Sequence, residues 1–152
     1  MKLAEALIIR SDLQRRIDEL KQRLIRSAKI QEGECPPENP KDLLFELDNC
    51  TNELTNIIQK IYKANAKEII DGIGTITDAL AKREVLMLKR NTLYSLLEET
   101  SIRQNRYSGS EIKILSTVNV SEIQKQIDDI SAEYRLLDTK IQEKNWLIDI
   151  TD

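Results

Sequence analysis

Apolar residues recur at helical spacing through most of the chain. Intervals of three and four residues separate the apolar positions in four long segments, and this period predicts four amphipathic helices. The segments are residues 2–31, 40–66, 78–102 and 121–148. At 1.5 Å per residue, a helix of about 25 residues is close to 38 Å long. The pattern therefore predicts long helices that lie side by side.

Residue types that favour helix starts precede three of these segments. Asn39 is the candidate N-cap of the second helix, and Pro40 suits its first position, where an N–H group is not needed. Thr77 is the candidate cap of the third helix. Ser121 and Gln124 have the spacing of a capping box, so we expect them to begin the fourth.

The helices differ in the width of their apolar stripes. The second has about three apolar positions in seven, which is typical of a helix in a bundle. The fourth has a narrow stripe, as in a coiled-coil seam, and few other apolar positions. A narrow seam invites pairing, either within the chain or with a second chain. Its residues are Ile123, Ile127, Ile130, Tyr134, Leu137, Ile141 and Ile148.

Two segments break the helical period. In KEIIDGIGTIT, residues 67–77, Asp71-Gly72 and Gly74 separate short β-branched pairs, which predicts a small hairpin at about 69–76. In RYSGSEIKILSTVNV, residues 106–120, apolar and polar residues alternate, which predicts a strand at about 111–118. A lone strand cannot satisfy its backbone, so this one needs the hairpin or the edge of a second chain as its partner.

Together these patterns predict a mainly α protein. We expect an elongated antiparallel helical bundle or coiled coil of about four long helices, with two short β excursions, as a single domain over residues 1–152. The composition agrees, because 32% of the residues are charged and only 4% are aromatic. The apolar runs are too short for a membrane span.

Composition also bears on chemistry. The chain has no histidine, which removes the commonest general base and the commonest transition-metal ligand. Its net charge of −3 does not indicate a nucleic-acid or membrane partner. Cys35 and Cys50 have neither metal-ligand nor redox spacing, so we expect reduced thiols in a cytoplasmic protein. We predict a protein that is not an enzyme, with no catalytic or metal-binding residues and no cofactor.

Two binding hypotheses concern the segment around Gly109. Backbone amides near Gly109, with Arg106 and Lys113, could form an anion nest. The Walker spacing is absent, so we favour a turn that leads into a strand. Nucleic-acid binding through residues 103–113, including Arg106 and Tyr107, is the second hypothesis. The charged faces of a helical bundle explain these residues more simply.

Three arginines occupy seam positions where leucine would be expected. They are Arg10, Arg83 and Arg90. A buried arginine needs a carboxylate partner and can fix register or oligomeric state. Alternatively, each extends its charge into solvent along its aliphatic stem. Our candidate interaction residues are Arg10, Arg83, Arg90, Arg106, Tyr107, Glu111, Lys113, Ile127, Tyr134 and Ile141.

Three separated motifs carry a resemblance to a known family. KLAEALIIRSDLQRRI, RYSGSEIK…STVNV and QKQIDDI…LDTKIQEKNW resemble a bacterial septicolysin-like family whose activity is unassigned. The label of that family implies a pore-forming cytolysin. The residues themselves argue against this, because we find neither an export signal nor an alternating stretch suited to a transmembrane barrel.

These observations lead to one main functional hypothesis and two alternatives. We expect a non-enzymatic helical protein that self-associates as a homo-oligomer through its narrow seam and its β excursions. A membrane-active oligomer, as the family label implies, is the first alternative. Weak nucleic-acid binding through residues 103–113 is the second.

Overall fold

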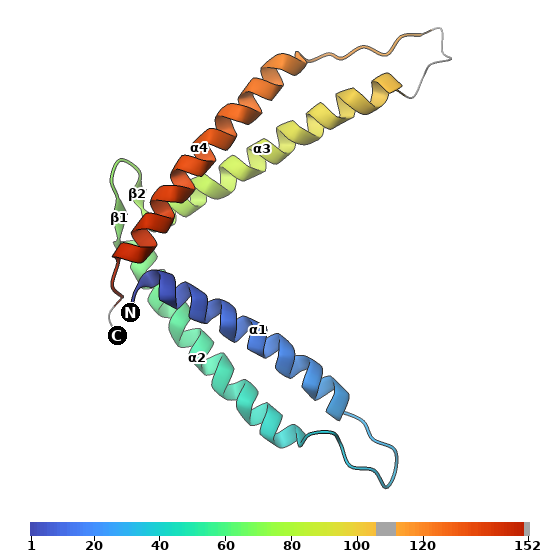
Figure 1. The fold of residues 1–152 in the computed structure, drawn as a ribbon, viewed down its shortest axis with the longest axis vertical. Helices are drawn as coiled ribbons and strands as arrows, with labels where there is room; N and C mark the ends of the chain where they lie inside the picture. Colours follow the sequence, from blue (N-terminus) through green and yellow to red (C-terminus); the bar gives the residue numbers. More distant parts are fainter. Residues whose placement is uncertain (106–111, 151–152) are drawn as a thin grey trace. The chain divides into compact units, whose positions relative to one another are not determined.

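The computed structural model describes the backbone of residues 1–105 and 112–150, and the side chains of 1–100 and 112–150. In this part of the chain the elements are four long helices and one two-stranded antiparallel sheet (Figure 1). The prediction of a mainly α protein is therefore confirmed. The helices are α1 (Leu3–Ser27), α2 (Pro40–Lys67), α3 (Ile76–Asn105) and α4 (Val120–Leu147), and the strands are β1 (Ile69–Ile70) and β2 (Gly74–Thr75).

The contacts divide the chain into two compact units. The first contains residues 1–68 together with the segment that begins at Lys144, and the second runs from Ile69 to Glu143. The single domain over residues 1–152 stays a prediction.

In the first unit, α1 and α2 form an antiparallel hairpin (Figure 1). Arg16 pairs with Glu46 at 2.7 Å, whereas Arg23, further along α1, pairs with the earlier Glu38 at 2.6 Å. This reversed order is the signature of antiparallel helices. Between the two helices, the apolar stripes bury a cluster that consists of Leu20, Leu43 and Cys50, with Ile17, Leu24 and Leu47 packed against it.

In the first unit, residues 1–3 pair with residues 148–150, near the other end of the sequence. The Leu3 N–H donates to the Ile148 carbonyl at 3.0 Å, and the Ile150 N–H donates to the Met1 carbonyl at 2.9 Å. The Lys2 ammonium adds an ion pair with the Asp149 carboxylate at 2.7 Å. Leu3, Ile148 and Ile150 are buried there. Nothing in the local hydrophobic pattern predicts this pairing.

The second unit begins with the predicted hairpin, which is confirmed. Ile69 pairs with Thr75, and Ile70 pairs with Gly74. Gly72 lies in the turn with a φ of 77°, a conformation that glycine adopts without steric cost. The hairpin buries Ile70, and Ile76 directly after it is buried as well.

The helix starts agree with the prediction in one case of three. Asn39 caps α2, because its side-chain oxygen accepts from the Lys41 N–H at 3.1 Å, and Pro40 occupies the first position. Thr77 was the wrong residue for α3, which begins two residues earlier than predicted, at Ile76. Asn119, and not the Ser121 and Gln124 pair, is positioned as the cap of α4, where it accepts from the Glu122 N–H at 3.2 Å.

A reciprocal cap holds the start of α3. The Asp78 carboxylate accepts from the Thr75 N–H at 2.7 Å and from the Thr75 hydroxyl at 2.8 Å. The Thr75 hydroxyl in turn accepts from the Asp78 N–H at 3.1 Å. This is a capping box with aspartate at the third position. Sequence inspection placed the helix start too late because Thr75 lies within the β-branched run of the hairpin.

The cap makes stability depend on pH. The hydrogen bonds from Thr75 hold the pKa of Asp78 below its ordinary value of 3.8. A carboxyl group whose pKa is lower in the folded state stabilises that state above its unfolded pKa, and the contribution is lost as the pH falls through the folded pKa. We therefore expect the melting temperature to fall below about pH 4, and to fall less steeply in Asp78→Asn than in the unaltered protein. Melting curves by circular dichroism between pH 2.5 and 7 measure this.

The matched control is Asp129→Asn, because Asp129 is an exposed carboxylate of the same unit without an ion pair in the described region. The melting temperature of Asp129→Asn should fall with decreasing pH as steeply as that of the unaltered protein. If the melting temperature of Asp78→Asn fell as steeply with decreasing pH as that of the unaltered protein, the cap would not contribute to the loss of stability in acid.

In the second unit, α3 and α4 lie side by side and are joined by ion pairs (Figure 1). Lys82 pairs with Glu133 at 3.0 Å, and Arg83 pairs with Asp138 at 2.5 Å. The narrow seam of α4 faces inward, because four of its side chains in this unit are at most 7% exposed. These are Ile127, Ile130, Leu137 and Ile141.

The predicted strand at 111–118 is wrong for the residues that are described. Residues 112–118 contain no strand. They run as an irregular connection toward α4, in which the Ser116 hydroxyl bonds both the N–H and the carbonyl of Val118. A strand needs a ladder partner, and β1 and β2 pair only with each other in the described sheet.

Candidate functional site

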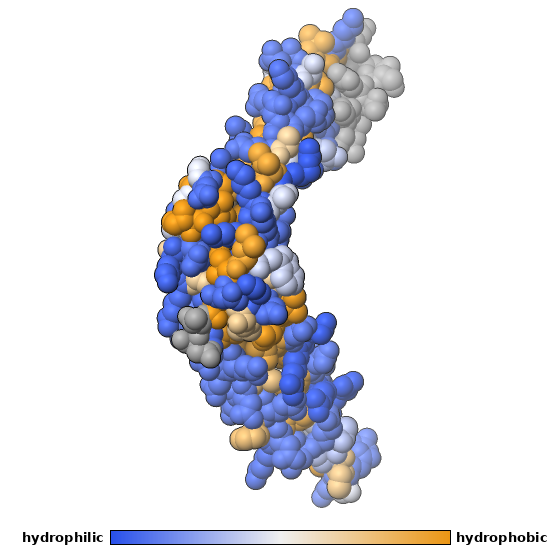
Figure 2. All heavy atoms as spheres, turned by 60° about the vertical axis from the view of Figure 1, so that its left-hand side comes forward, coloured by the Kyte–Doolittle hydropathy of each residue, from blue (hydrophilic) through white to orange (hydrophobic). Residues whose placement is uncertain are grey.

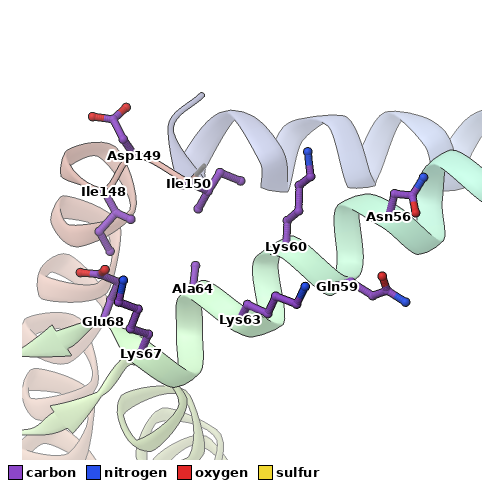
Figure 3. Close-up of a pocket in the computed structure, with 10 residues that line it drawn as sticks. All are labelled: Asn56, Gln59, Lys60, Lys63, Ala64, Lys67, Glu68, Ile148, Asp149 and Ile150. Atoms are coloured by element: carbon purple, nitrogen blue, oxygen red, sulfur yellow. The ribbon is translucent and has the colours of Figure 1, made fainter. Parts of the chain in front are cut away.

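A hollow of about 390 Å³ lies in the first unit, beside the C-terminal half of α2 (Figure 3). Lys60, Lys63 and Lys67 contribute side chains from successive turns, and Ile148 to Ile150 line the other side. The three ammonium groups alone would favour an anion. Two features oppose one: the Glu68 and Asp149 carboxylates are part of the lining, and the C-terminal end of a helix carries negative partial charge. The hollow therefore lacks a concentrated positive potential.

A second candidate is the outer face of α3. At 100° per residue, Ala81, Val85, Leu88 and Thr92 lie along one line of the helix, opposite the line of Ala79, Arg83, Leu86 and Arg90. All four outer residues are exposed; Val85 is 62% exposed and Leu88 is 66% exposed. We call these four residues the outer row. Apolar atoms reach the surface in patches among hydrophilic ones elsewhere on the molecule too (Figure 2), but a row at coiled-coil spacing is different in kind.

The outer row has the features of a contact surface. The Thr92 hydroxyl donates to the Leu88 carbonyl at 2.9 Å, so its hydrogen-bonding need is met within the helix. Its methyl group therefore continues the apolar row. Ala81, Val85 and the stems of Lys82 and Lys89 border a shallow depression beside it. Exposure of an apolar face to water is unfavourable, and contiguous exposed apolar faces therefore often mark interaction sites.

Charged residues of opposite sign border the two sides of the outer row. Lys82 and Lys89 follow one side, and Glu84 and Asn91 follow the other. Lys82 is already paired with Glu133 of α4 at 3.0 Å. Neither Lys89 nor Glu84 has an ion pair among the residues whose side chains are described. One cation and one anion therefore remain available, one on each side.

The three seam arginines behave differently. Arg83 pairs with a carboxylate, that of Asp138 on α4. Arg10 is half-buried on α1 and has no ion pair in the described part of the chain. Arg90 is half-buried on α3, where its Nη1 lies 3.7 Å from the Met87 sulfur and its buried Nε has no hydrogen-bond partner among the described atoms. A role for these arginines in fixing oligomeric state stays a prediction.

The other predicted interaction residues fall into three groups. Ile127 and Ile141 are buried and Tyr134 is half-buried within a single chain, so the narrow seam is used inside the second unit. Lys113 is exposed in the connection before α4. Arg106, Tyr107 and Glu111 lie outside the described residues, as does the proposed nest at Gly109. The structure does not bring the predicted residues together into one site.

Sequence inspection missed the outer row. On the third helix it considered the seam that contains Arg83 and Arg90. The four-three-four spacing on the opposite face is nevertheless legible in the sequence, at Ala81, Val85, Leu88 and Thr92. The signal that could have found it is a helix that is apolar on two opposite faces, since only one face can pack against α4.

The described residues contain no group of three or more His, Cys, Asp or Glu side chains that could hold a metal ion. None of the helices, as far as they are described, is long and apolar enough to cross a membrane.

Comparisons with known proteins place the chain but assign it no activity. A solved structure from Corynebacterium diphtheriae, described as a functionally unknown conserved protein, is 40% identical and aligns over 99% of both chains with a TM-score of 0.94. No curated protein matches the chain. A family model described as a family of unknown function, DUF6847, matches residues 10–150. The chain belongs to this family of unknown function.

Proposed function

We propose that this protein is a non-enzymatic helical protein that self-associates through the outer row of α3. The observation that carries the proposal is the exposure of Val85 and Leu88, 62% and 66%, in one line with Ala81 and Thr92. The narrow seam of α4 is a poorer candidate, because four of its side chains in this unit are already buried within the chain. The outer row is an apolar face of α3 that α4 leaves uncovered.

The size of the surface sets the expected affinity. From Ala81 to Thr92 the row covers about three helical turns, or roughly 16 Å of helix. Two such rows facing each other bury on the order of 1,000 Å² in total, at the low end of specific interfaces. We therefore expect a dissociation constant in the micromolar range, so that the oligomer forms and separates with concentration.

A charge placed in the row should separate the oligomer. Leu88→Lys puts an ammonium group at the centre of the interface, where burial without a partner is unfavourable. We expect the unaltered protein to reach the mass of an oligomer at about 100 µM, at low and at high salt, while Leu88→Lys stays a monomer under both conditions. Size-exclusion chromatography with light scattering measures the mass.

Phe45→Lys is the matched control, because Phe45 is 69% exposed on α2, outside the row. It should keep the oligomer, and the helical circular dichroism of both variants should equal that of the unaltered protein. A monomeric unaltered protein at every concentration would contradict the proposed function. An oligomer that persists in Leu88→Lys would contradict the choice of surface.

Both alternatives keep their own tests. A membrane-active oligomer, as the septicolysin-like label implies, would release dye from liposomes at micromolar protein. Nucleic-acid binding through residues 103–113 would give a gel shift at low salt that weakens steeply as salt is added. No contact among the described residues favours either of them over self-association.

A further inference from the structure

The outer row has the spacing of a coiled-coil core. Taking Val85 and Thr92 as a positions makes Ala81 and Leu88 d positions. Lys82 and Lys89 are then e positions, and Glu84 and Asn91 are g positions. In a coiled coil, e and g residues border the core and decide which way the partner helix runs. The charges beside the row can therefore be tested against each orientation.

A parallel partner satisfies the available charges. When two copies of α3 run in the same direction and in register, the g residue of one helix faces the e residue five positions later on the other. Glu84 of each copy then faces Lys89 of the other. These are the two flanking charges that lack an ion pair within the described side chains, whereas Lys82 is already held by Glu133. Asn91 faces Leu96, which adds no charge to the contact.

An antiparallel partner does not satisfy them. In that orientation e residues face e residues and g residues face g residues. With Val85 of one copy against Leu88 of the other, Lys89 faces Lys82, and Glu84 faces Asn91. Two lysine pairs would then repel each other, and Glu84 would gain no cation.

We propose that the partner of the outer row is a second copy of α3, parallel and in register, with Glu84 of each copy paired to Lys89 of the other. The inference rests on the proposed function and adds to it the orientation and the residues that select it. Apolar contacts of Val85 and Leu88 hold the two copies together, and the ion pairs fix the direction.

Three charge variants separate the two orientations at low salt. Glu84→Lys should weaken the dimer roughly tenfold, because two attractive pairs become repulsive, and Lys89→Glu should weaken it by a similar factor. The double variant reverses each pair and should restore the affinity to within about threefold. An antiparallel dimer would respond in the opposite sense, since Lys89→Glu would face Lys82 and tighten it. Sedimentation equilibrium gives the dissociation constants.

A cysteine probe tests the register independently. In a Cys35→Ser background, which removes the exposed native thiol, Ala81→Cys places a thiol at a d position. Under mild oxidation a parallel dimer should link Cys side chains of the two copies, whereas in an antiparallel dimer position 81 lies opposite position 92. Efficient linking of Ala81→Cys alone supports the proposal. Linking only when Ala81→Cys is mixed with Thr92→Cys overturns it.

The failures are distinguishable. If the unaltered protein is a monomer, both proposals fall. Suppose instead that the unaltered protein is a dimer, that Leu88→Lys dissociates this dimer, and that Lys89→Glu raises its affinity. Self-association through the outer row would then be supported, and the parallel orientation would be wrong. All charge variants should keep the melting temperature of the unaltered monomer, because the altered side chains are exposed on the second unit.

Discussion

Leu20→Ala is expected to lower the free energy of unfolding by about 3 kcal/mol. Leu20 is fully buried between α1 and α2, in contact with the cluster of Leu43 and Cys50. Removing its branched end loses apolar burial and leaves a cavity, because neighbouring side chains on two long helices relax only in part. Urea unfolding followed by circular dichroism measures the loss as a lower midpoint with an unchanged slope.

Ile25→Ala is the matched control for this prediction. Ile25 lies on the same helix but is 59% exposed, so its truncation should change the free energy of unfolding by less than about 0.5 kcal/mol. If Leu20→Ala and Ile25→Ala were equally mild, the α1–α2 cluster would not be the core of the first unit.

Gly74→Ala is expected to cost about 3 kcal/mol, from two sources. Gly74 has a φ of 127°, which an alanine adopts only with strain of about 1–3 kcal/mol. An added Cβ would also lie 2.6 Å from the Asp78 carboxylate. That carboxylate cannot turn away without giving up both hydrogen bonds from Thr75, and loss of a helix cap costs about 0.5–2 kcal/mol. Urea unfolding again gives the value.

Two comparisons separate these sources. Gly72→Ala has a φ of 77° and open space around the new Cβ, so it should show the backbone strain alone. In an Asp78→Ala background the 2.6 Å contact with the carboxylate disappears and only a 3.3 Å contact with the Cβ of residue 78 remains, so the additional cost of Gly74→Ala should shrink toward that of Gly72→Ala. An undiminished cost in that background would mean that the cap and Gly74 are not coupled.

The sequence predicted the helices well because apolar residues recur at helical spacing in each of them. The three-four spacing placed α2 to within a residue at both ends, and Asn39 with Pro40 marked its start. The hairpin was legible for another reason: Asp71-Gly72 supplies the turn that its strands need. In both cases the residues that carry the signal lie within the element that they predict.

The misses are contacts that no local pattern encodes. Residues 112–118 alternate like a strand, but alternation does not supply a ladder partner, and the described segment has none. The ion pair of Lys2 with Asp149 joins residues almost a full chain apart. The outer row was missed because α3 has apolar residues on two opposite faces, and an amphipathic helix is expected to have only one apolar stripe. Of the candidate site, the seam residues were correctly placed on helices, but their partner proved to be the same chain.

The pairing of residues 1–3 with residues 148–150 has a consequence for the order in which the protein folds as it is synthesised. The stretch from Ile69 to Glu143 emerges from the ribosome without interruption, so its helices can meet as soon as α4 has been made. The start of α1 must wait for Ile148 and Ile150. The Leu3 N–H therefore has no access to the Ile148 carbonyl until that residue has been made, and the pairing forms late because loop closure over such a long separation is slow.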